Sequence, residues 1–199
     1  AVLLATASCG SSDVASRDGT GDGEGVDLSS ATFVGRESCR TCHEAETEAW
    51  EGSHHDLALD MATDSTVIGD FDDASFTQFG VTHRFFRRDG GYWVETEGAD
   101  GSMTEFEVTH VIGVEPLQQY LTPFPGGRLQ TLPTTWDARP AADGGQRWYH
   151  VYPNERIAPD DPLFWTTVNQ NWNYQCAECH STDLQKNYRV GSEAYATTW

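Results

Sequence analysis

Two copies of the pattern C-x-x-C-H, at residues 39–43 and 176–180, constrain this chain more than any other feature. This spacing places two thiols and an imidazole on one short turn, the arrangement that attaches c-type haem. The thiols add to the two vinyl groups of haem as thioethers, and the histidine becomes the proximal iron ligand. We therefore expect two covalently attached haem c groups. The predicted haem-binding residues are Cys39, Cys42 and His43 in the first motif, and Cys176, Cys179 and His180 in the second.

Chance and three other chemistries explain this pattern less well. Histidine is 7 of 199 residues, so a histidine after both pairs by chance has a probability of about 0.001. A four-thiolate zinc site would need closer pairs than these, which lie about 130 residues apart, and it would not need the histidines. A thioredoxin-type redox pair belongs in a βαβ context, which the sequence lacks. A disulfide within each pair would close a small, strained ring, although disulfides do suit exported proteins.

The charge balance excludes several classes of partner. The chain has 12 Lys+Arg and 31 Asp+Glu, for a formal net charge of −19. Nucleic-acid binding needs clustered cations, so we expect no nucleic-acid partner. The acidity favours weak, salt-sensitive docking with redox protein partners that carry a basic surface. The sequence contains no run of 18 or more apolar residues, the length that a membrane-spanning helix needs.

The beginning of the chain is typical of an exported protein. Residues 1–9 resemble the end of a signal or lipoprotein-type segment, in which small residues precede Cys9. A lipidated cysteine usually follows a leucine three residues earlier, and Thr6 stands here, so a membrane tether through Cys9 and an incidental cysteine both stay open. Residues 10–32 are rich in Gly, Ser and Asp and predict a flexible linker. We expect the haem domain over residues 33–199 and a periplasmic or outer-surface location in a bacterium.

The hydrophobic pattern changes period along the haem domain. Helical spacing near both motifs gives way to alternating apolar and polar residues in the middle, with Gly-rich turns that favour an antiparallel meander. The predicted fold class is α+β, in which helical CxxCH segments flank a small antiparallel β-sheet and the haems form part of the core. The expected segments are helical over 39–61, helix and loop over 161–188, and strands over 81–88, 92–97, 103–112, 129–132 and 148–152.

Histidine is the expected second axial ligand, because five histidines lie outside the motifs and the chain has two methionines. Bis-histidine ligation favours a low-potential haem. His54 and His55 follow His43 by 11 and 12 residues, about 16–18 Å along a continuous helix. Two axial nitrogens lie only about 4 Å apart. Neither histidine can therefore bind the haem of His43 unless the chain folds back at Gly52. If the chain does not fold back, one of the two reaches a neighbouring haem, or both form a solvated polar pair.

His110 is a further candidate ligand. It shares a predicted strand face with Val108 and Ile112, so it points to the apolar side. That position suits either a hydrogen-bonded core histidine or an iron ligand. The sequence leaves the same two roles open for His83 and His150. The predicted metal ligands are His43, His180, His55, His54 and His110.

Several further segments carry a family resemblance. They are residues 33–35, 50–58, 69–73, 116–121, 125–130 and 170–173. Together with the motifs they resemble exported multihaem c-type cytochromes of the cytochrome c-552/c-554 type, which are often fused to tetratricopeptide repeats. The resemblance covers about residues 33–199. Similar proteins continue with further CxxCH motifs, so this chain looks like an N-terminal fragment, and more haems are expected in the full-length protein.

The resemblance also implies a ligand and a function. A Ser-x-His-x-x-Ala pattern carries a distal ligand in similar proteins and maps to Ser53, His55 and Ala58, which favours His55 over His54. The implied function is electron transfer by bis-histidine haems, with no catalytic residues and therefore a carrier rather than an enzyme. The alternative is a multihaem oxidoreductase that acts on small nitrogen compounds such as hydroxylamine or nitrite at one five-coordinate haem. A scaffold module rests on analogy with the repeat-fused members alone.

Overall fold

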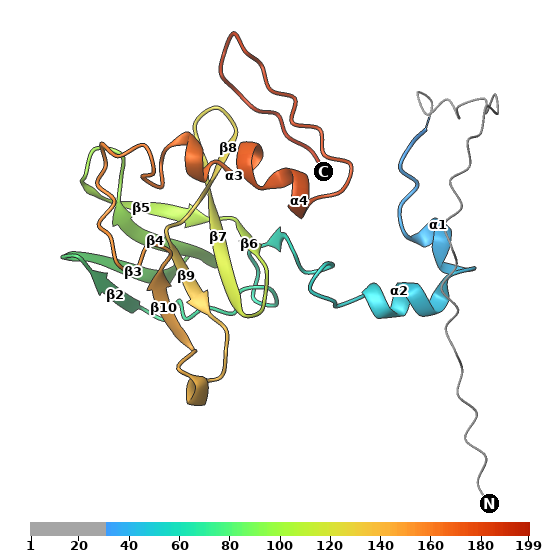
Figure 1. Cartoon of the computed structure of the whole chain (residues 1–199), viewed down its shortest axis with the longest axis horizontal. Helices are drawn as coiled ribbons and strands as arrows, with labels where there is room; N and C mark the ends of the chain where they lie inside the picture. Colours follow the sequence, from blue (N-terminus) through green and yellow to red (C-terminus); the bar gives the residue numbers. More distant parts are fainter. Residues whose placement is uncertain (1–30) are drawn as a thin grey trace, which may run out of the picture. The chain divides into compact units, whose positions relative to one another are not determined.

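The computed structural model describes residues 31–199, which are mostly antiparallel β-sheet with few helices (Figure 1). Val34–Trp199 form one compact unit. The predicted signal segment 1–9, its Cys9 and nearly all of the predicted linker 10–32 lie outside the described residues. Within residues 31–199, the strands form one sheet of six and one of four, so the sheet region is larger than the small sheet that the sequence predicted.

The four-stranded sheet contains the predicted meander. Its order is β2-β3-β4-β5, with antiparallel neighbours throughout. Phe85 lies opposite Val94, and Val94 lies opposite Phe106, so the register that the alternating pattern requires is present. The strands are β2 (Ala74–Gln78), β3 (Val81–Arg88), β4 (Gly91–Glu97) and β5 (Met103–Val108).

The six-stranded sheet has the order β1-β6-β7-β9-β10, and β8 pairs with β7. The strand predicted over 103–112 is divided, because residues after Thr109 leave the first sheet and join this one. The strands predicted over 129–132 and 148–152 correspond to β8 and β10. The strands are β1 (Asp60–Met61), β6 (His110–Ile112), β7 (Leu117–Phe124), β8 (Arg128–Thr131), β9 (Thr134–Asp137) and β10 (Arg147–His150).

Strands β7 and β9 were not predicted, for a physical reason. Both bury polar side chains: Gln118 and Thr134 are fully buried, where an apolar residue would have marked a strand. Strand β7 also contains Pro123, which lowers the strand propensity of a segment. Gln118 keeps its buried amide satisfied, because it accepts a hydrogen bond from the Ile68 N–H at 2.9 Å and donates to the Thr66 carbonyl at 2.9 Å.

Aromatic rings of the chain itself fill the space between the two sheets. Phe85 of β3 stacks on Trp148 of β10, with ring centroids 3.6 Å apart and planes within 1°. Phe71 lies edge-on to both rings, at centroid distances of 6.0 and 5.4 Å. Aromatic pairs of this kind stabilise a core beyond the area they bury. These rings form the core between the two sheets, and the contribution of haem to the core stays a prediction.

The helices are short. The helical pattern predicted over 39–61, with a kink or end at Gly52-Ser53, forms α-helix only up to Trp50, where the second helix ends and the chain turns. Glu51 (φ −59°, ψ 124°) and Gly52 (φ 72°) have the dihedral angles of a type II turn, which favours glycine at its third residue. The α-helices are α1 (Glu37–Arg40), α2 (Glu44–Trp50), α3 (Trp172–Gln175) and α4 (Ala177–His180), and the 3₁₀ turns are η1 (Ala141–Asp143) and η2 (Val168–Gln170).

No helix among the described residues is long and apolar enough to cross a membrane.

Burial of His83 makes the stability of the sheet region depend on pH. Its side chain is almost fully buried, and Nδ1 lies 2.7 Å from the Thr96 hydroxyl. Burial, with help from the nearby His150 and Arg156, lowers the pKa of His83 to about 4. The folded protein therefore keeps His83 neutral where the unfolded chain, with a pKa near 6.5, binds a proton.

We predict that the free energy of unfolding falls by about 3 kcal/mol between pH 6.5 and pH 4 because of this one group. Denaturant titrations of the wild type and of His83→Gln across that range measure the effect. The His83→Gln variant should lose this part of the pH dependence, whatever its stability at pH 7. An identical slope in both proteins would contradict the prediction.

Candidate functional site

The second CxxCH motif forms a helical turn that is packed against the six-stranded sheet. The N–H groups of Cys179 and His180 both donate to the Cys176 carbonyl, at 3.1 and 3.2 Å. Ala177 is fully buried and belongs to a small apolar cluster with Ile112, Leu121 and Trp172. A small residue inside the motif therefore allows the turn to lie close to the sheet, while Cys179 stays exposed.

Two buried amides fasten the segment before this motif to β8, next to α3 in Figure 1. The Gln130 amide donates to the carbonyls of Trp165 and Thr167, at 2.6 and 2.7 Å. The Asn173 amide accepts from the Leu129 N–H at 2.7 Å and also donates to the Gly127 carbonyl. Buried amides that make such hydrogen bonds fix one geometry, because a displacement would break these bonds in a buried setting.

A pocket opens between this motif and the turn that carries His55. Its cavity volume is about 330 Å³, at the lower end of the range of about 300–1,000 Å³ typical of cofactor pockets. The pocket brings His55 and His180 together, although they are far apart in the sequence. Its other lining residues are Trp50, Asp56, Ala58, Leu59, Cys179, Ser181, Thr182 and Trp199.

The chemistry of the pocket residues fits a haem. The Nδ1 atom of His180 is buried and has no hydrogen-bond partner in the described part of the chain, so the ring is not committed to another contact through this atom. None of the four described cysteines forms a disulfide, so both thiols of the second motif are available. Trp50 and Trp199 are large apolar side chains that are 42% and 48% exposed at the pocket, surface that a porphyrin would cover.

Burial changes the pKa of one of the two thiols of the second motif. Cys176 is half-buried, and burial raises the pKa of its thiol, with a smaller contribution from the charge of Cys179. Cys176 is therefore held as a thiol, the form whose S–H adds across a haem vinyl group.

The first CxxCH motif has a different setting. It lies between α1 and α2, and Cys39, Cys42 and His43 are all exposed. The Thr47 hydroxyl donates to the His43 carbonyl at 2.8 Å and so extends α2 back to the motif. The Nδ1 atom of His43 lies 3.9 Å from the Glu46 carboxylate.

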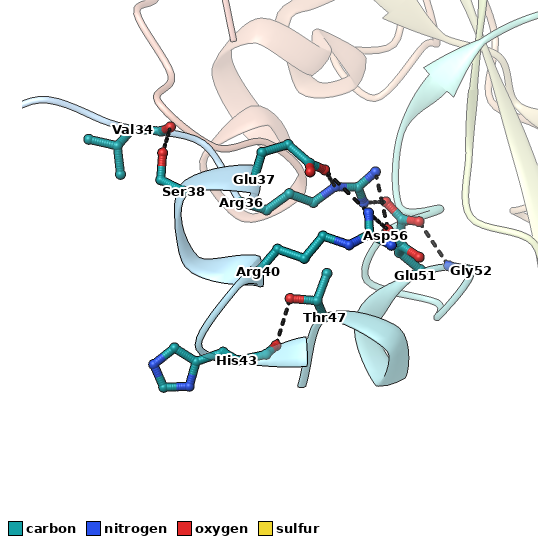
Figure 2. A network of polar contacts seen from close by, with 10 residues as sticks. All are labelled: Val34, Arg36, Glu37, Ser38, Arg40, His43, Thr47, Glu51, Gly52 and Asp56. Carbon is teal, nitrogen blue, oxygen red and sulfur yellow. Dashed lines mark hydrogen bonds and ion pairs between the residues drawn. The ribbon is translucent and has the colours of Figure 1, made fainter. Parts of the chain in front are cut away.

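A charged network surrounds the first motif (Figure 2). The guanidinium groups of Arg36 and Arg40 point toward carboxylates beyond the end of α2. Arg40 lies 3.2 Å from Glu51, and Arg36 lies 3.6 Å from Asp56. The network therefore ties the motif to the turn that leads to His55.

The other predicted ligands, His54 and His110, do not line the pocket of His180. His54, the neighbour of His55, lines a different pocket with Ile68 and Trp136. His110 is partly buried, its Nδ1 lies 2.9 Å from the Thr109 hydroxyl, and its ring lies 5.7 Å from that of Trp199. Burial lowers the pKa of His110 and favours a neutral ring.

His83 and His150 lie together in the sheet region, with ring centroids 6.1 Å apart. The Tyr152 N–H donates to Nδ1 of His150 at 3.0 Å, so this ring has a structural role. Burial, and then the charge of Arg156, lower the pKa of His150. Both residues behave as core histidines, the alternative that the sequence left open for them.

The four-thiolate zinc alternative finds no support. Across residues 31–199, no group of three or more His, Cys, Asp or Glu side chains is arranged to hold a metal ion. The two cysteine pairs therefore do not converge on one tetrahedral site.

Comparison with known proteins points to the same class as the motifs. The family described as cytochrome c554 and c-prime matches residues 38–72, which contain the first CxxCH motif and both His54 and His55. This match supports a c-type cytochrome, a class that carries covalently bound haem c and transfers electrons. Searches of curated proteins and of solved structures found no match.

Sequence reasoning missed the residues that hold the site in place. Gln130 and Asn173 belong to segments that carried the family resemblance, but their role is visible only in the fold. Trp172 is fully buried next to the second motif. The one available signal was the cluster of amide side chains at residues 170–175, just before Cys176.

We predict that Asn173→Ala lowers the free energy of unfolding by about 1–3 kcal/mol, because it leaves the Leu129 N–H and the Gly127 carbonyl without partners in a buried setting. Gln175→Ala, an exposed position on the same helix, is the matched control and should change stability by less than about 0.5 kcal/mol. Denaturant unfolding measures both. Equal effects of the two substitutions would show that the amide does not anchor the motif.

Proposed function

We propose that this chain is an electron carrier in which two haem c groups are covalently bound, the second of them between two histidines. The observation that carries the proposal is the pocket that His55, Cys179 and His180 line together. The family match at residues 38–72 supports the class of the protein, and the pocket supports the ligand assignment.

Each residue of the second site has a role in this proposal. Cys176 and Cys179 hold the haem as thioethers, His180 is the proximal ligand, and His55 is the distal ligand. The bound haem supplies a one-electron redox centre. The surrounding chain fixes its orientation, because Ala177 is packed on the sheet and Trp199 contacts Trp172 edge-on at a centroid distance of 5.1 Å.

The first site uses Cys39, Cys42 and His43 in the same way. These residues are exposed, so a haem there would be covered less by the described part of the chain than the second haem. Exposure of a haem edge suits rapid electron exchange with a partner protein.

Electron transfer is favoured over the oxidoreductase alternative by the second site. A haem with histidine on both faces has no open position for hydroxylamine or nitrite at the iron. The proposal therefore assigns no catalytic residue.

The proposal includes an exported location and a basic redox partner. A net charge of −19 favours attraction to a positively charged docking surface, weakened by added salt. Tethering through a lipidated Cys9 remains part of the same proposal.

We predict that the protein, expressed with a c-type haem maturation system, carries two haems, and that Cys176→Ala/Cys179→Ala carries one. A pyridine haemochrome assay together with the intact mass measures the number. Two haems on that double variant, or none on the wild type, would refute the attachment sites. Cys39→Ala/Cys42→Ala is the corresponding control and should also carry one.

We predict that His55→Ala leaves one coordination position of the second haem iron free, because the substitution removes the distal nitrogen ligand. The absorption spectrum should gain a high-spin component, and the ferrous protein should bind carbon monoxide rapidly. The neighbouring substitution His54→Ala is the control and should leave the spectrum unchanged, since His54 lines another pocket. The opposite pattern would make His54 the ligand.

A further inference from the structure

The ion pairs around the first motif converge on the segment that precedes His55 (Figure 2). Arg36 contacts both Glu51 and Asp56, at 3.9 and 3.6 Å, and Arg40 contacts Glu51 at 3.2 Å. The two carboxylates lie on either side of the turn at Gly52. The two cations come from α1 and the residue before it, so the contacts join the first CxxCH turn to the far side of α2.

Asp56 also fixes the backbone of the turn. Its carboxylate accepts a hydrogen bond from the Gly52 N–H at 2.8 Å, and its own N–H donates to the Ser53 hydroxyl at 3.3 Å. The Leu57 N–H donates to the Ser53 carbonyl at 3.0 Å. His55 lies inside this set of contacts, so the direction of its side chain depends on them.

The carboxylates are the less exposed members of the network. The side chains of Asp56 and Glu51 are 25% and 34% exposed, whereas those of the arginines are 47% and 45% exposed. The Arg36 guanidinium also lies 5.0 Å from the centre of the Trp50 ring. Both Trp50 and Asp56 line the pocket of His180, so the network reaches that pocket directly.

We propose that Arg36, Glu51 and Asp56 are positioning residues, which hold His55 against the second haem by fastening its turn to the first haem motif. This inference rests on the proposed function, in which His55 is the distal ligand. The network makes the two sites mechanically dependent: the helical turn bearing Cys39 and Cys42 is also the support of the ligand of the other haem.

Single isolated ion pairs on a surface contribute little, but here several charges share partners, and Asp56 adds a backbone hydrogen bond. Loss of the Asp56 charge should let His55 leave the iron more often without unfolding the chain. Because the carboxylates are partly exposed, the effect should diminish as salt screens the charges.

The experiment measures carbon monoxide binding to the ferrous, haem-loaded protein in Asp56→Asn, Glu51→Gln and Arg36→Gln. Dissociation of His55 limits this reaction at the second haem, so we expect its rate to rise about three- to tenfold in Asp56→Asn. Raising the ionic strength should accelerate the wild type toward the variant. Asp56→Asn keeps an oxygen that can accept from the Gly52 N–H, so the fold is preserved.

Glu48→Gln is the matched control, because Glu48 is exposed on the same helix and makes no ion pair in the described residues. His55→Ala identifies the kinetic phase that belongs to the second haem. Rates in Asp56→Asn equal to those in Glu48→Gln, or a rise that salt does not diminish, would overturn the positioning role. If His55→Ala itself leaves carbon monoxide binding unchanged, the ligand assignment is wrong and both proposals fall together.

Discussion

Anchoring of the segment before Cys176 by buried amides is the constraint on which the second site depends. Asn173 accepts a hydrogen bond from the Leu129 N–H of β8, and Gln130 of β8 donates to the carbonyls of Trp165 and Thr167, just before η2. These groups are buried, so breaking the bonds would leave them without partners. The burial of Trp172 and Ala177 adds apolar contact on the same face. The motif is only one helical turn long and is not rigid by itself. Packing against the sheet holds it in place.

The two CxxCH motifs show how one local pattern acquires two settings. The motif at Cys176 has a packed alanine and a buried histidine nitrogen, whereas the motif at Cys39 is exposed and held by charged side chains. Hydrogen bonds between buried amides persist in salt, while the ion pairs of Arg36 and Arg40 are screened by it. The second site is therefore the more rigid of the two, and the first is the site that ionic strength affects.

The two sheets show which strands a sequence pattern can predict and which it cannot. Alternation predicted β3, β4 and β5, because one face of that sheet is covered with aromatic and aliphatic residues while the other is mostly charged and polar, with Phe86 and Trp93 as exceptions. It did not predict β7, since Gln118 and Thr122 occupy its buried positions and Pro123 interrupts it. A buried polar residue is stable only with partners elsewhere in the chain, such as the Thr66 carbonyl for Gln118, and those partners are not visible locally.

The sequence by itself determined the attachment chemistry. Two thiols and a histidine within five residues are close together in any helical turn, so the capacity to bind haem covalently follows from the local spacing. Only the tertiary structure shows which of the two adjacent histidines lines the same pocket as the second motif. His54 and His55 are chemically alike and adjacent, and the type II turn at Gly52 directs them to different pockets. The difference between them depends on which distant residues line each pocket, such as Cys179 and Trp199 at the pocket of His55, and no local pattern contains that information.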